Sequence, residues 1–413
     1  ALGHTDETRF TARQSRISML AEGQINADTK AAFYTELDFQ GGAQTSNSNE
    51  SNSYVPRIRN VYGTVDWNNA FGGLTNLHFL GGQNWSLATL NSKGISPRNE
   101  VTPPTIDAQY VPGFTWTRQP QLRVAADFMD KQLWVAGSIE NPQTTFASAA
   151  TGTTGTSISG ITVTNTGAPA AGFDTANTLS INHVPDLIGK VAYEPNLWGS
   201  RPLHLEVFGM YRQLYDRANV TSATNVLHLP VGANNAETDA GGIGAGLTFA
   251  AIPKLLDIQG SILTGKGIGR YGAGQLPDSV VGVDGTLKAI PETMFLAGAT
   301  LHPTKTLDVY VFGGEEHESR VATTIGANHF GFGSPFANLA NCNVEGGTCA
   351  PNIQLMTQVT GGFWDRVYQG SYGSVRVGVQ YSWTELNSFS GTGGLAPKTN
   401  DSMIFTSFRY YPF

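Results

Sequence analysis

Charged side chains are scarce in this sequence. Asp, Glu, Lys and Arg make up 14% of its 413 residues, against roughly 25% in a typical soluble domain. The 25 Lys and Arg are outnumbered by 32 Asp and Glu, which gives a formal net charge of −7. A protein that binds nucleic acid without regard to its sequence carries a surplus of basic residues, because they must neutralise phosphates. The composition argues against that class, and we expect no nucleic-acid partner.

Cysteine and long apolar runs are scarce as well. The two cysteines, Cys342 and Cys349, form no CxxC motif, which argues against a zinc site built on thiolates. The long uncharged stretch at 144–173 consists mainly of Thr, Ser, Gly and Ala, whereas a membrane-spanning helix requires roughly 20 apolar residues. No leader peptide is visible at Ala1, which fits both a processed chain and a cytoplasmic one. Composition alone leaves the compartment open.

What the sequence has in abundance is alternation. In SVRVGVQYSW, at 374–383, Val, Tyr and Trp occupy every second position, and Ser, Arg, Gly and Gln occupy the positions between them. The same period of two recurs at 29–39, 131–140, 201–212 and 353–364. This period predicts β-strands that have one apolar face and one polar face.

The connections between these segments alternate between short and long. Short ones lie at 67–73, 127–131, 194–201, 250–254, 302–306 and 368–373, and long ones at 41–54, 84–113, 141–182 and 318–352. Strands of roughly ten residues with short turns on one rim and long loops on the other are typical of outer-membrane β-barrels. A closed sheet pairs every backbone group and can therefore sit in lipid. We predict an all-β fold, a single transmembrane antiparallel β-barrel over residues 1–413.

The end of the chain, FTSFRYYPF, has five aromatic residues in its last nine. It resembles the final strand of bacterial outer-membrane barrels, in which a terminal Phe and upstream aromatics are read by the assembly machinery. Phe405, Tyr411 and Phe413 share one face with Arg409. We therefore expect Arg409 to point at lipid unless it snorkels to the interface; a register shift or a subunit interface would also relieve it.

Five segments resemble those of a known family, the DcaP-like trimeric porins, which are relatives of the phosphate-selective porins. They are TRFTARQSRISM, FLGGQNWS, RQPQLRV, VPDLIGKVAY and GKGIGRY. The resemblance covers most of the chain and is strongest over residues 8–123. It implies a homotrimer of 16-stranded barrels in the bacterial outer membrane, in contact with lipid and lipopolysaccharide. It also implies passive diffusion of small anions, particularly dicarboxylates, without a cofactor.

The strand count departs from this pattern. We find about fifteen strands, and the alternation of connections then places the two ends of the chain on opposite rims. Bacterial single-chain barrels have even strand numbers. We expect that a strand upstream of Ala1 is missing from this sequence. Alternatively, residues 1–7 contribute a short strand, or two strands have been counted as one.

Basic residues near the narrowest point would set the potential that a passing ion feels. Arginine suits carboxylates because its planar guanidinium donates two hydrogen bonds at once. The candidate pore-lining residues are Arg57, Arg59, Arg118 and Arg123, with Lys93 and Arg98 on a loop, 84–113, that resembles the inward-folding constriction loop of porins. Glu36 and Asp38 are expected to form the opposite wall. Arg118 and Arg123 have odd spacing, so both can face inward only if a bulge near Pro120 reconciles them.

The remaining motifs predict no chemistry beyond a pore. We expect Cys342 and Cys349 to form a disulfide, because the compartment is oxidising; the alternative is two free thiols. GIGRYG at 267–272 matches GxGxxG but opens no helix, so we interpret it as a loop entry. EEHES at 315–319 lacks the HExxH pattern and is expected to be a solvated loop rather than a metal site. We predict a porin and no enzyme; the alternatives are a structural or adhesive barrel, or an outer-membrane hydrolase.

Overall fold

The fold is described from a computed structural model. It describes residues 6–41, 55–73, 75–107, 110–147, 161–164, 180–197, 201–222, 230–325, 328–344, 347, 349 and 351–412. Phe413, part of the predicted assembly signal, lies outside the described residues. So do residues 1–5 and parts of the long connections at 41–54, 84–113, 141–182 and 318–352.

One antiparallel sheet of 17 strands forms the wall of the molecule. Its long strands are β1 Ile17–Asn26, β2 Thr29–Asp38, β3 Arg57–Asn69, β4 Thr75–Trp85, β5 Arg118–Phe128, β6 Leu133–Glu140, β8 Asp186–Tyr193, β10 Arg201–Val220, β11 Gly232–Ile252, β12 Leu256–Lys266, β15 Pro291–Leu301, β16 Leu307–Glu318, β19 Ile353–Gly370, β20 Gly373–Ser388 and β21 Lys398–Tyr411. Two short strands, β7 Ile161–Thr164 and β9 Asn196–Leu197, pair with β10. The predicted all-β antiparallel class is confirmed.

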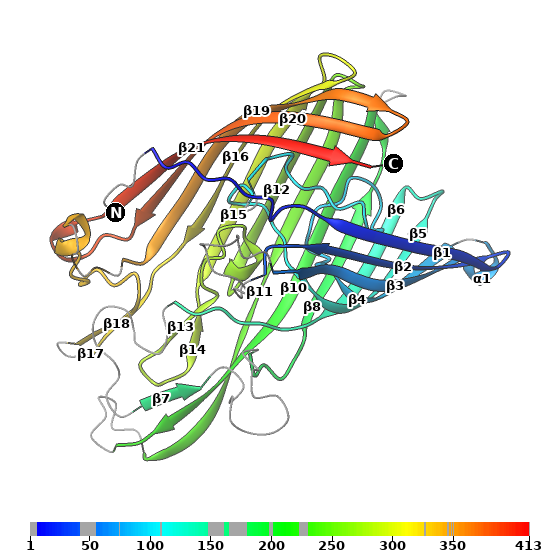
Figure 1. The fold of residues 1–413 in the computed structure, drawn as a ribbon. Coiled ribbons are helices and arrows are strands. Elements are labelled where there is room, and N and C mark those ends of the chain that lie inside the picture. Colours follow the sequence, from blue (N-terminus) through cyan, green and yellow to red (C-terminus); the bar gives the residue numbers. More distant parts are fainter. Residues whose placement is uncertain are drawn as a thin grey trace.

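Each long strand pairs with the next long strand along the chain, and the sheet is strongly curved (Figure 1). Within the described residues, β1 pairs only with β2 and β21 only with β20. The wall therefore has fifteen long strands, the number counted from the sequence, and a sixteenth long strand is not among the described residues. β10 and β11 have 20 and 21 residues, longer than expected, because they pair with each other as far as Val220 and Gly232.

The two faces of the wall follow the predicted alternation. On β5 the side chains of Leu122 and Val124 are exposed on the outer face, whereas Gln121 and Arg123 are buried on the inner face. An apolar outer face and a polar inner face suit a barrel that meets lipid outside and water inside.

The last strand reverses the predicted orientation of Arg409. The carbon of its guanidinium lies 4.1 Å from the centre of the Trp364 ring, which is buried on the inner face. The outer face of β21 is formed instead by Ile404 and Phe408, with exposed fractions of 75% and 70%. The expectation that Arg409 points at lipid is wrong. The inner position is favoured because an arginine facing the bilayer midplane costs about 2–4 kcal/mol.

The rest of the described structure is short. It comprises one four-residue helix, α1 Ala70–Gly73, three 3₁₀ turns at η1 Gly269–Tyr271, η2 Ala340–Asn343 and η3 Thr392–Gly394, and two hairpins, β13 Ser279–Val281 with β14 Leu287–Ala289 and β17 Val321–Ile325 with β18 Asn328–Phe332. Among the residues that the structure describes, no helix is long and apolar enough to cross a membrane. GIGRYG begins the connection after β12, as expected of a loop entry.

Two connections fold back against the inner face of the wall. The first, residues 86–117, links β4 to β5 and includes all of the predicted 84–113 loop except Asn84 and Trp85, which belong to β4; the second, residues 267–290, links β12 to β15 and was not expected. Leu87 and Ile95 of the first connection pack in one buried cluster with Ile268 and Tyr271 of the second. These two connections therefore fill part of the space that the curved sheet encloses.

Candidate functional site

Arg57 and Arg59 lie on the inner face, in direct contact with Glu36 and Asp38. Arg57 Nη2 lies 2.6 Å from Asp38 Oδ2, and Arg59 Nη1 lies 2.9 Å from the same oxygen. Arg59 Nε lies 2.5 Å from Glu36 Oε1. The two carboxylates are thus ion-paired to these arginines across adjacent strands, and the expectation that they form an opposite wall is wrong. The β2–β3 register brings them together, since Asp38 stands directly opposite Arg57.

Arg118 joins this group through aromatic contacts. Its guanidinium carbon lies 5.1 Å from the Trp85 ring centre and 5.2 Å from that of Trp116, and Arg59 lies 5.8 Å from the Trp85 ring. Arg118 Nε and Nη1 are buried, and within the described chain they have no hydrogen-bond partner. We call Arg57, Arg59 and Arg118 the arginine cluster. Arg118 is its least neutralised member.

Arg123 faces inward but is not part of the arginine cluster. It is buried, with its Nε 3.0 Å from Gln121 Oε1 and its Nη2 2.6 Å from the carbonyl oxygen of Trp85. The β4–β5 register is continuous past Pro120, so the expected bulge is absent there. Arg118 is instead the first residue of β5, where the chain enters the sheet from the connection, and its guanidinium lies over the rings of Trp85 and Trp116. Arg123 stabilises the start of the 86–117 connection.

Lys93 and Arg98 lie apart from each other on the 86–117 connection, and both are exposed. The guanidinium carbon of Arg98 lies 5.7 Å from the ring centre of Tyr34 on β2. Lys93 lines a cavity at the short-turn end of the wall. The six predicted basic residues thus lie in four separate places. Three of them form the arginine cluster, and Arg123, Lys93 and Arg98 each lie elsewhere.

The 86–117 connection crosses the interior from one side of the wall to the other. On β6, Glu140 accepts a hydrogen bond of 2.8 Å from the backbone N–H of Leu87. Lys190 of β8, which is fully buried, donates to the carbonyl oxygen of Thr89 at 2.7 Å. On the far side, the Trp364 indole of β19 donates to the carbonyl oxygen of Pro104 at 2.8 Å. The described part of this connection is therefore held to both sides of the wall.

Two carboxyl groups of this connection, those of Glu100 and Asp107, have shifted pKa values. Burial raises the pKa of Glu100, although the nearby Arg123 opposes the shift. Burial likewise raises the pKa of Asp107, against hydrogen bonds from Gln380 and Gln358. Both groups therefore hold a proton to higher pH than an exposed carboxyl, which reduces the negative charge inside the hollow.

The second inward connection is anchored by Arg212 of β10. Its Nε lies 3.1 Å from Asp186 Oδ2 and its Nη1 lies 2.8 Å from Asp278 Oδ1, and all three side chains are fully buried. The Tyr271 hydroxyl donates to Asp186 Oδ2 at 2.7 Å. The alternation of β10 placed Arg212 on the polar face, but no local pattern linked it to Asp278, 66 residues away.

The motif EEHES is not a solvated loop. β16 continues to Glu318, and Glu316 and Glu318 are fully buried on the inner face. Glu316 Oε1 accepts hydrogen bonds from the backbone N–H groups of Gly113 at 2.8 Å and of Gly274 at 2.9 Å. The sequence expectation was wrong because the strand is longer than the apolar alternation indicated. Glu316 instead joins both inward connections to the wall.

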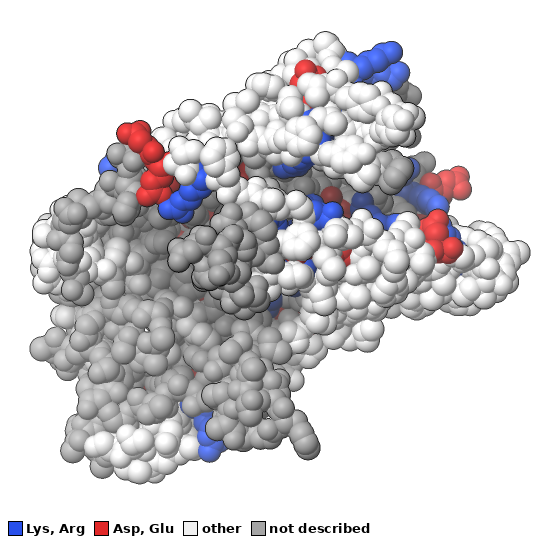
Figure 2. Space-filling view, in the orientation of Figure 1, with Lys and Arg blue, Asp and Glu red and all other residues white. Residues whose placement is uncertain are grey.

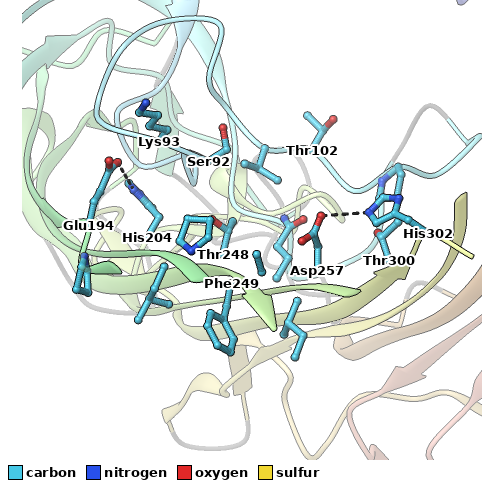
Figure 3. Close-up of a pocket in the computed structure, with 18 of the residues that line it drawn as sticks. Ser92, Lys93, Thr102, Glu194, His204, Thr248, Phe249, Asp257, Thr300 and His302 are labelled. Atoms are coloured by element: carbon cyan, nitrogen blue, oxygen red, sulfur yellow. Dashed lines mark hydrogen bonds and ion pairs between the residues drawn. The ribbon is translucent and has the colours of Figure 1, made fainter. Parts of the chain in front are cut away.

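A cavity of about 840 Å³ opens between the 86–117 connection and the short-turn ends of β8, β10, β11, β12 and β15. Figure 3 shows Glu194 and His204 at one end of this cavity and Asp257 and His302 at the other, with Lys93 on the connection above them. Figure 2 shows further basic side chains along the hollow of the molecule, between the arm of β19–β21 and the arm of β1–β5. The interior therefore carries charged side chains of both signs.

Cys342 and Cys349 are joined by a disulfide, with their Cα atoms 4.9 Å apart. In the described part of the chain, no three His, Cys, Asp or Glu side chains are arranged to hold a metal ion.

An all-antiparallel wall with an apolar outer face and two inward connections defines the fold of an outer-membrane β-barrel channel. Among solved structures, the chain resembles the outer-membrane channel DcaP of Acinetobacter baumannii, with 16% sequence identity and a TM-score of 0.60 over 97% of this chain and 86% of that one. The resemblance to DcaP-like porins indicated by the sequence is thus confirmed at the level of the fold.

Two further solved structures are similar at lower scores. OprB of Pseudomonas putida has 10% identity and a TM-score of 0.47, over 95% of this chain and 87% of that one. The trimer form of OmpT, an outer-membrane protein of Vibrio cholerae, has 10% identity and a TM-score of 0.42, over 95% and 91%. No protein-family model matches the chain, and no curated protein matches it in sequence.

Proposed function

We propose that this protein is a porin of the bacterial outer membrane through which small hydrophilic solutes diffuse passively. The observation that carries the proposal is the 86–117 connection, held across a polar interior by Glu140 and Lys190 on one side and by Trp364 on the other. A wall with an apolar exterior and a partly obstructed polar interior fits a size-limited channel. Lipid and lipopolysaccharide would contact the outer face.

The solutes that fit best are small anions, dicarboxylates among them. The arginine cluster supports this, because its three guanidinium groups are matched by only two carboxylates, Asp38 and Glu36, which leaves an excess of positive charge on this part of the inner face. Excess positive charge beside a low-dielectric wall raises the local concentration of anions. On the basis of the resemblance to DcaP-like porins, we also propose that the protein forms a homotrimer and that it has no catalytic activity.

Conductance in planar lipid bilayers tests the porin proposal. A porin gives stepwise, salt-dependent conductance, a structural or adhesive barrel gives none, and a hydrolase gives substrate turnover. Electrophoresis in SDS without boiling tests the trimer, since a closed hydrogen-bonded sheet resists the detergent until it is heated. Absence of conductance from folded, membrane-inserted protein would overturn the proposal.

Replacing Arg118 by Ser tests anion selectivity. We expect the reversal potential in a salt gradient to shift toward cations, with the anion-to-cation permeability ratio reduced roughly threefold to fivefold. A unit charge a few ångströms from an ion contributes about 1 kcal/mol even in bulk water. The matched control is Arg217→Ser on β10, where Arg217 is exposed and donates to Asn235. Equal permeability ratios in the two variants would place the selective charge elsewhere.

A further inference from the structure

Three histidines of this chain are each held between two carboxylates. His78 lies 2.7 Å from Asp66 and 2.9 Å from Asp127; His204 lies 3.0 Å from Glu194 and 3.0 Å from Glu206; His302 lies 3.1 Å from Asp257 and 2.7 Å from Asp308. In every case each ring nitrogen faces a different carboxylate. We call these sets the three histidine triads.

All three histidine triads lie near the same rim of the wall, the one with the short turns. His78 is close to the β3–β4 turn, His204 follows the connection from β8 to β10, and His302 begins the β15–β16 turn. His204 and His302 line the 840 Å³ cavity, where Figure 3 shows them with Glu194 and Asp257. The triads are therefore spread along the wall from β3 to β16.

The charged groups around each imidazole are mainly its own two carboxylates. His78 stacks on the Trp134 ring at 5.1 Å between ring centres. Beside His204, Lys190 of β8 is paired with Glu206 at 2.7 Å, and Lys93 of the 86–117 connection lines the same cavity. For His302 the charged neighbours are Asp257 of β12 and Asp308 of β16.

The protonation of the imidazole decides the charge of each triad. With a protonated ring, two carboxylates leave a triad at −1; with a neutral ring, the same triad stands at −2. Histidine is the side chain whose charge ordinarily changes between about pH 5 and 8. For His302, which lies in a turn, burial disfavours the charged ring, but the hydrogen bonds to Asp308 and Asp257 outweigh this and raise its pKa.

We propose that the three histidine triads form a second, pH-dependent selectivity filter at the short-turn mouth of the pore. The proposal rests on the porin function proposed above. When the imidazoles are protonated, each triad carries only one negative charge, and anions pass more readily than at higher pH. When they lose their protons, up to three additional negative charges face the mouth, so it favours cations and repels anions.

The experiment measures the reversal potential of the intact protein in planar bilayers under a KCl gradient between pH 5.5 and 9. We expect the anion-to-cation permeability ratio of the wild type to fall by roughly threefold or more as the pH rises. In the triple variant His78→Gln, His204→Gln, His302→Gln we expect this pH dependence to disappear, because glutamine keeps the hydrogen-bonding groups but does not titrate.

The control is His183→Gln. His183 lies on the long-loop side, half exposed, with one carboxylate neighbour, Glu237, at 3.4 Å. This variant should retain the wild-type pH dependence. If the triple variant does not fold, His302→Gln alone, at the most exposed of the three positions, should reduce the pH dependence by roughly one third, as one of the three titrating charges is removed.

The outcomes separate the two proposals. Channels with pH-independent selectivity, or the same pH dependence in the wild type and the histidine variants, would overturn the filter while leaving the porin intact. No channels at any pH, from protein that is folded and inserted, would overturn the porin function itself.

Discussion

The carboxylate of Glu316 accepts a hydrogen bond of 2.8 Å from the backbone N–H of Gly113. The approach is close because Gly113 has a φ of +87° and lies against the wall, where a Cβ would collide with the carbonyl oxygen of Phe295. Only glycine fits this position without strain. Since Glu316 also binds Gly274 of the second connection, one side chain fixes both inward segments at the same point of the wall.

Replacing Glu316 by Ala should loosen both inward connections. Two buried N–H groups would lose their acceptor, at a cost of about 1–3 kcal/mol each. We expect a lower free energy of unfolding and noisier single-channel current than in the wild type. Glu315→Ala is the control, because Glu315 is exposed on the opposite face of the same strand. Identical current noise in the two variants would show that Glu316 does not restrain the connections.

Arg212→Met should be the more damaging change on β10. It leaves the buried carboxylates of Asp186 and Asp278 without their partner, and breaking a buried ion pair in this way costs about 3–5 kcal/mol. The measurement is urea unfolding of the protein refolded into lipid vesicles. Arg217→Met, an exposed position on the same strand, should change stability little. Adding Asp278→Asn to Arg212→Met should recover part of the loss; no recovery would contradict the pairing.

The bond between Cys342 and Cys349 should stabilise the described part of the β16–β19 connection. With a separation of 7 residues, the loop-entropy model predicts a contribution of roughly 2.5 kcal/mol from the constraint on the unfolded chain. Mass spectrometry after alkylation without reduction should find both cysteines unmodified. Two alkylated cysteines in the native protein would reject the bridge.

Stability should fall as the pH rises through the titration of His302. The pKa of this histidine is raised in the folded protein, where Asp308 and Asp257 bind the protonated ring against the cost of its burial. Its contribution is therefore fully present below the pKa of about 6.5 in the unfolded chain and is lost as the pH rises through the higher folded value. In the His302→Gln variant, the midpoint of unfolding should depend less on pH between pH 6 and 9 than it does in the wild type. His317→Gln, at the other end of β16, should leave the curve unchanged.

The wall of this protein could be predicted from its sequence almost completely. Alternation such as that of residues 131–140 fixes which side chains face outward, because successive side chains of a strand point to opposite faces. The lengths of the connections predicted which strands are neighbours, since short turns join adjacent antiparallel strands. The local pattern did not predict where some strands end. The EEHES motif continues β16, and both β10 and β11 extend beyond their apolar alternating segments.

The interior was decided by the tertiary structure. The sequence placed Arg57, Arg59, Glu36 and Asp38 on polar faces, but only the β2–β3 register decided that they neutralise one another. In the same way, Arg212 meets Asp278, and Glu316 meets Gly113 across 203 residues, only after the sheet has curved and the connections have folded inward. Alternation is a property of neighbouring residues and is readable locally. Ion pairing inside a barrel depends on curvature and long-range contacts, for which a single sequence carries no periodic signal.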